Sequence, residues 1–204
     1  MNMKKISIFL ILCTIFSVCS LAQNETKARE IMNKTANRLN RKGGACAKFT
    51  LSNTKGSTSG IITVKGNKFK AQTSEAIVWF NGKTQWTYIK KTDEVNITNP
   101  TQAQQQMMNP YTFINMYKSG YKLTVNTNKQ NYNIHMTALN KNKNIQELYI
   151  TINKTTFIPS QIKMLQETTW STITISDFKE KKQSDQVFIF NPKNYPSAEI
   201  IDLR

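Results

Sequence analysis

The hydrophobic and polar residues of this chain follow two different periods. Between residues 24 and 42 the apolar side chains recur every three or four positions, which is the spacing of one face of an α-helix. Asn24 is a candidate N-terminal cap, and Gly43-Gly44 marks the end. From residue 45 onwards apolar and polar residues alternate, as they do in strands with one buried face. The pattern therefore predicts an amphipathic N-terminal helix followed by a mainly β fold.

The alternating part divides into a meander of about six strands, an interruption, and about five further strands that begin at Gly120. Within the meander, Asn81-Gly82 joins two β-like runs and is a strong hairpin signal. Short polar turns between about eleven strands predict an antiparallel, all-β barrel or strongly curved sheet with two helices. Neither an internal repeat nor a linker indicates a second domain.

Residues 101–120 interrupt the alternation. They combine helix-forming residues with Pro110, which follows Asn109 at a plausible first helical position, and they end at Gly120. Their apolar residues are too many for one narrow stripe, so a helix here needs to be covered on more than one side. The segment predicts a second helix that lies across the sheet as a lid.

The first residues have the pattern of a secretory signal peptide. Lys4 and Lys5 precede an apolar run that is too short to span a bilayer. The small residues Ser20 and Ala22 favour cleavage before Gln23. We therefore expect an exported, periplasmic protein.

A lipid anchor at Cys19 is the alternative, but Val18 stands where glycine or alanine normally precedes an acylated cysteine. The expected organisation is thus a signal peptide at residues 1–22 and a single, unanchored domain at residues 23–204. After cleavage Cys46 is the remaining cysteine, so an intrachain disulfide is not expected.

The net charge of +16 at pH 7 comes almost entirely from lysine spread along the chain. An export signal disfavours nucleic acid as a partner. The scarcity of arginine also disfavours it, because arginine is the residue that binds phosphate through two hydrogen bonds. The excess of positive charge is either a compositional feature of a solvated surface or a means of attracting the protein to anionic membrane surfaces.

Candidate catalytic residues are few. His135 is the single histidine, and the alternation places it opposite the apolar face of its strand. The sequence GSTSG at residues 56–60 departs from G-x-S-x-G at Thr58 and is interpreted as a turn. Asp93 and Glu94 are adjacent in a turn, whereas the two catalytic carboxylates of a glycosidase face each other across a cleft. We expect no enzyme, no cofactor and no metal site; a secreted hydrolase using these groups is the least favoured alternative.

Aromatic and methionine side chains gather in the meander and in the interrupting segment. An ordinary core is one interpretation, and a closable pocket for a flexible apolar ligand is the other. The candidate cavity and lid residues are Phe49, Leu51, Phe69, Trp79, Trp86, Tyr88, Met107, Met108, Tyr111, Phe113, Ile114 and Tyr117.

The block NGKTQWTY at residues 81–88 resembles the D-G-K-T-x-W-x-Y signature of the periplasmic outer-membrane lipoprotein carrier family, the LolA-type chaperones. Residues 59–70 and 109–120 match the family in placement, as a strand–turn–strand unit and a lid helix. The ending at residues 190–204 looks like that of related Bacteroides-group sequences.

This resemblance implies an unclosed β-barrel of about eleven strands, covered by helices, around an apolar cavity that holds lipoprotein acyl chains. It further implies a monomeric periplasmic carrier with acylated lipoproteins as cargo and transient partners at the inner and outer membranes. A binding module for another lipid or hydrophobic molecule in envelope maintenance is the alternative.

One position departs from the family pattern. Members from enteric bacteria carry an arginine in the turn after the second strand, and it ties the lid shut. Gly66 stands at that place here, between Lys65 and Lys68, and lysine lacks the planar fork of donors. The resemblance therefore predicts the cavity without this lid lock.

Overall fold

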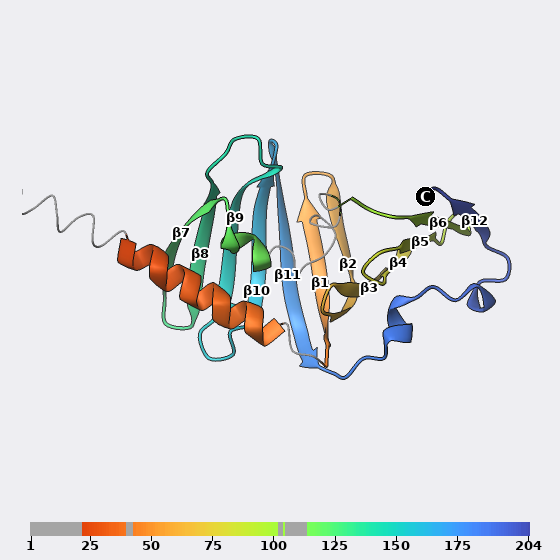
Figure 1. Cartoon of the computed structure of the whole chain (residues 1–204), viewed down its shortest axis with the longest axis horizontal. Helices are drawn as coiled ribbons and strands as arrows, with labels where there is room; N and C mark the ends of the chain where they lie inside the picture. Colours follow the sequence, from red (N-terminus) through yellow and green to blue (C-terminus); the bar gives the residue numbers. More distant parts are fainter. Residues whose placement is uncertain (1–21, 40–42, 102–103, 105–113) are drawn as a thin grey trace, which may run out of the picture.

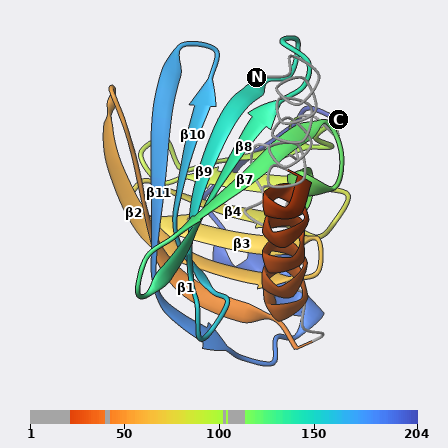
Figure 2. The ribbon, with the colours of Figure 1, turned by 90° about the vertical axis from the view of Figure 1, so that its left-hand side faces the viewer.

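The computed structural model describes residues 22–39, 43–101, 104 and 114–204. The described chain forms one curved, twelve-stranded sheet that does not close, with a helix at residues 22–39 (Figure 1). Figure 2 shows the sheet curling towards this helix, which lies on the concave side near β7 and β8. The mainly β fold and the N-terminal helix are thus confirmed. Apart from Ala22, the predicted signal peptide lies outside the described residues.

The sheet contains every strand that the alternation predicts, and one more. Its strands are β1 (Ala45–Asn53), β2 (Gly56–Lys65), β3 (Lys68–Thr73), β4 (Ala76–Phe80), β5 (Gln85–Ile89), β6 (Glu94–Thr98), β7 (Tyr121–Thr127), β8 (Asn131–Ala138), β9 (Ile145–Asn153), β10 (Pro159–Gln166), β11 (Thr169–Glu180) and β12 (Glu199–Asp202). Their order is β12-β6-β5-β4-β3-β2-β1-β11-β10-β9-β8-β7. Neighbours are antiparallel except β12, which runs parallel to β6. The additional strand is β12.

The interpretation of residues 56–60 as a turn is wrong, because β2 begins at Gly56. The hairpin with β1 extends to Asn53, and hydroxyl pairs join the two strands near its tip. Thr50 Oγ1 lies 2.9 Å from Ser59 Oγ, and Ser52 Oγ lies 3.0 Å from Ser57 Oγ. Such cross-strand hydroxyl pairs stabilise a sheet.

The helix packs on the concave face through one stripe of buried residues. These are Ala28, Ile31, Met32, Thr35, Ala36 and Leu39. Asn24 lies inside the helix, so its predicted role as a cap is wrong. Its side chain instead binds β7: Nδ2 donates to Val125 O at 3.1 Å, and Oδ1 accepts from Val125 N at 2.8 Å. This long-range bond fixes the helix to the sheet.

The predicted mid-chain lid helix falls largely on residues 102–103 and 105–113, outside the described part. What the structure describes there is helical residues at 104 and 114–115 and a 3₁₀ turn, η1 (Met116–Lys118). The N-terminal helix holds this turn: Arg29 Nη1 donates to Tyr117 O at 2.6 Å, and Nη2 donates to Tyr121 O at 3.1 Å. A lid helix is therefore not shown by the described residues.

After β11 the chain crosses to the convex face through η2 (Asp185–Phe188) and η3 (Pro192–Asn194) and then forms β12 (Figure 1). The turn between β2 and β3, which contains Gly66, is tied to this segment. Asp185 accepts from Lys65 at 2.9 Å and pairs with Lys68 at 3.2 Å. The hydrogen bond from Lys65, and then that from Lys68, lowers the pKa of Asp185. This contact stabilises the fold at neutral pH and is lost as the pH falls through that lowered pKa.

Thr35 provides a test of the helix packing. Its hydroxyl is fully buried and has no hydrogen-bond partner within the described residues. Replacing an unsatisfied buried hydroxyl by a group of similar shape removes a desolvation cost. Thr35→Val is therefore expected to raise the free energy of unfolding by about 1 kcal/mol, or the melting temperature by about 2–4 °C.

Thr26→Val is the matched control, because the exposed Thr26 hydroxyl donates to Ala22 O at 2.9 Å. It is expected to give no gain. Thermal denaturation of both variants measures the difference, and a Thr35→Val protein no more stable than the parent would contradict this packing.

Candidate functional site

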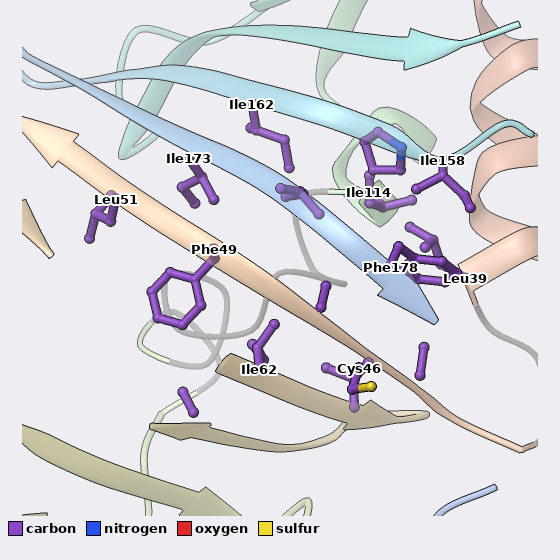
Figure 3. A pocket seen from close by; sticks show the side chains of 16 residues that line it. Leu39, Cys46, Phe49, Leu51, Ile62, Ile114, Ile158, Ile162, Ile173 and Phe178 are labelled. Carbon is purple, nitrogen blue, oxygen red and sulfur yellow. The ribbon is translucent and has the colours of Figure 1, made fainter. Parts of the chain in front are cut away.

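The concave face borders a cavity of about 200 Å³ (Figure 3). Its walls come from β1, β2, β3, β10 and β11, with one residue each from the helix, the β9–β10 turn and the segment before η1. The lining residues are Leu39, Ala45, Cys46, Ala47, Phe49, Leu51, Ile62, Val64, Ala71, Ile114, Ile158, Pro159, Ile162, Ile173, Ile175 and Phe178.

The chemistry of this wall is uniform. Among the residues that the structure describes, every lining side chain is a hydrocarbon except that of Cys46, whose thiol behaves as a small apolar group. Pockets lined by hydrocarbon side chains accept hydrocarbon ligands. The apolar character of these described lining residues favours the binding of an apolar chain.

Of the eight predicted site residues that the structure describes, three line the cavity: Phe49, Leu51 and Ile114. The Phe49 ring covers Gly60 on the neighbouring strand. A Cβ atom at Gly60 would lie 3.0 Å from this ring and 2.2 Å from Gln72 O, so only glycine fits here. The close approach of β2, β3 and the ring thus shapes one wall.

Two further predicted residues, Phe69 and Tyr117, are buried in the concave core without lining the cavity. The Phe69 ring packs against Phe80 with centroids 5.5 Å apart. The Tyr117 hydroxyl donates to Asn33 of the helix. Both residues hold elements beside the cavity in place.

The structure places Trp79, Trp86 and Tyr88 on the opposite, convex face. The cause is strand register, because Phe80 pairs with Phe69 on the concave face and its neighbour Trp79 must point the other way. In the Asn81-Gly82 hairpin, Trp79 pairs with Trp86, so the Trp86 side chain lies on the convex face as well. Tyr88, two residues further along the strand, lies on the same face. The expectation that these three residues wall the same cavity as Phe49 is therefore corrected.

These convex aromatics pack under the C-terminal segment. The Trp79 and Phe190 rings have centroids 5.5 Å apart, and those of Tyr88 and Tyr195 are 4.6 Å apart. The Tyr88 hydroxyl donates to Asp93 at 2.9 Å, and this bond raises the pKa of Tyr88. The cluster holds the C-terminal segment on the sheet.

Met107, Met108, Tyr111 and Phe113 lie outside the described residues, so their predicted lid role stays a prediction. The sequence reasoning also missed one wall of the cavity, which includes Ile162 of β10 and Ile173, Ile175 and Phe178 of β11. Alternation in the sequence indicates that these side chains share one face of their strands. It does not indicate that β11 pairs with β1 and so contributes to the same cavity.

The candidate hydrolytic residues do not converge. His135 lies on the convex face, where its ring stacks on Tyr149 at 4.2 Å and Nε2 lies 3.1 Å from Glu147 Oε2. Asp93 and Glu94 stand at the β5–β6 turn, several strands away in the sheet order. Among the described residues no group of three or more His, Cys, Asp or Glu could hold a metal ion.

A family model described as outer membrane lipoprotein carrier protein LolA matches residues 18–168. The chain belongs to this LolA family. The resemblance carried by NGKTQWTY is thereby confirmed. The matched residues end just before β11, so β11 and the C-terminal segment lie beyond them.

This LolA-family chain is similar to several solved structures, one of them with a TM-score above 0.5. An uncharacterized conserved protein from Thermus thermophilus matches with a TM-score of 0.61 and 12% identity, over 86% of this chain and 99% of its own. A LolA superfamily protein from Nitrosomonas europaea gives 0.45 and 11% identity, over 80% and 97%. A putative outer membrane lipoprotein-sorting protein domain from Vibrio parahaemolyticus gives 0.46 and 12%, over 81% and 97%. None of the curated proteins matches the sequence.

Helices that could cross a membrane are absent from the described part of this LolA-family chain.

Two neighbouring residues of β3 test the position of the cavity. Ala71 lines it, whereas Gln72 is exposed on the convex face. Ala71→Phe adds a ring to the cavity and is expected to lower the affinity for an apolar dye at least tenfold, since the added side chain fills the space. Gln72→Phe adds the same ring outside and is expected to leave dye affinity unchanged. Equal dye binding by the two variants in a fluorescence titration would contradict this location.

Proposed function

We propose that this protein is a periplasmic carrier that holds the acyl chains of lipoproteins in its concave cavity and passes them towards the outer membrane. The observation that carries the proposal is the hydrocarbon wall of the cavity. Membership of the LolA family supports a role in binding lipid or lipoprotein. The proposal includes export by the segment at residues 1–22, a single domain at residues 23–204 that acts as a monomer, and transient partners at both membranes.

The cost of exposing an acyl chain explains why such a carrier has no need of reactive residues. Each buried methylene contributes about 0.8 kcal/mol, so a chain of about sixteen carbons costs on the order of 12 kcal/mol in water. The isoleucine, leucine and phenylalanine wall removes part of that cost. Binding that relies on apolar contact alone is reversible, as delivery requires.

An acylated peptide and its unacylated counterpart provide the direct test. The acylated peptide is expected to displace an apolar dye from the cavity, and the unacylated peptide is expected not to. A free fatty acid of the same chain length distinguishes the alternative: if it competes better than the acylated peptide, the protein binds lipids rather than lipoproteins. Equal displacement by the two peptides would contradict any role of the acyl chain.

Tryptophan emission gives a second readout of the same experiment. Trp79 and Trp86 lie on the convex face, and Trp170 lies there too, with its ring 5.9 Å from that of Tyr149. None of these three lines the cavity. Dye displacement is therefore expected with little change in tryptophan emission, whereas strong quenching would place the ligand on the convex face.

A further inference from the structure

The concave face changes from apolar to polar as it crosses the sheet. Residues that pair across antiparallel strands share one face, so two rows can be followed from strand to strand. One row runs through Ile62, Ala71, Val78, Thr87 and Asn96. The next runs through Val64, Phe69, Phe80, Gln85 and Thr98. Both rows begin at the cavity wall and end on β5 and β6 in amide and hydroxyl side chains.

The polar end of these rows lies close to the cavity. Ala71 of β3 lines the cavity, and Thr87 stands two strands away in the same row. Because neighbouring strands are about 4.8 Å apart, Thr87 is about 10 Å from Ala71. A ligand with an apolar chain in the cavity can therefore place a polar group on β5.

Gln85 is the residue that points to such a group. Its side chain is only 8% exposed and lies on the same face as Phe80. Nε2 donates to Thr87 Oγ1 at 3.1 Å. Oε1 is buried and accepts no hydrogen bond from any residue that the structure describes. A buried acceptor without a partner carries an uncompensated desolvation cost, so a donor brought by a ligand is favoured.

The surroundings define which donor fits. Gln85, Thr87, Asn96 and Thr98 are uncharged, and Glu94 lies on the same face at the far end of β6, paired with Ile89. A free carboxylate gains no cationic partner from these residues. A neutral amide N–H meets the Gln85 acceptor without burying a charge.

We propose that Gln85 forms a polar subsite that accepts a hydrogen bond from the amide N–H joining an acyl chain to a peptide, while the chain itself occupies the cavity. This inference rests on the proposed function and adds the recognition of the acyl–peptide linkage. Thr87 orients the Gln85 amide by accepting from Nε2.

Two probes that differ by one atom test the subsite. One is a peptide with an N-palmitoyl glycine, and the other is its ester analogue, in which the linking N–H is replaced by oxygen. The parent protein is expected to bind the amide about threefold to tenfold more tightly, the range of a single net hydrogen bond. Dye displacement measures both affinities.

Gln85→Met keeps the length of the side chain and removes the acceptor, so the two probes are expected to bind equally well. Gln72→Met makes the same change on the exposed convex face and is expected to keep the parent preference. Circular dichroism and thermal denaturation confirm that both variants fold.

Equal affinity of the parent for the two probes overturns the subsite while leaving acyl-chain binding intact, and this result needs no variant. A preference that persists in Gln85→Met overturns it too. If neither probe displaces the dye, the proposed function falls together with the subsite.

Discussion

An open, curved sheet has a concave apolar face that it cannot bury against itself, and this constraint governs the rest of the structure. The helix at residues 22–39 covers part of that face with a stripe that includes Met32 and Leu39. Over β1, β2, β10 and β11 the apolar side chains instead border a cavity. Empty apolar space costs dispersion contacts that a ligand can restore. A protein of this form therefore gains stability from an apolar guest, which is the physical basis of the proposed carrier role.

The convex face is covered by the chain itself, so its aromatic cluster is separate from the concave cavity. There the C-terminal segment brings Phe190 and Tyr195 onto Trp79. Asp185 anchors the same segment to Lys65 and Lys68, which flank the β2–β3 turn that contains Gly66. The β2–β3 turn thus serves the convex face in this chain. The mid-chain turn is held by Arg29 of the helix, which donates to the Tyr117 carbonyl in η1 and to the Tyr121 carbonyl at the start of β7.

Local patterns predicted the elements well, and non-local pairing accounts for what they missed. Alternation located strands β1–β6 and β7–β11. Asn81-Gly82 located the hairpin between β4 and β5, whose register follows from its turn. The face of Trp79 depends on the pairing of β3 with β4, which a count of aromatics ignores. The wall at Ile173 depends on β1 meeting β11, strands far apart in the sequence. The parallel pairing of β12 with β6 and the bond from Asn24 to Val125 are non-local in the same way.

The central claim is that an acyl chain occupies the concave cavity, and isoleucine methyl NMR tests it most directly. Ile62, Ile162 and Ile173 line the cavity, whereas Ile61, Ile77 and Ile97 lie on the convex face. With an unlabelled acylated peptide, the account predicts chemical-shift changes of the cavity methyl signals that are clearly larger than those of the convex methyl signals. Shift changes confined to the convex methyl signals would contradict it.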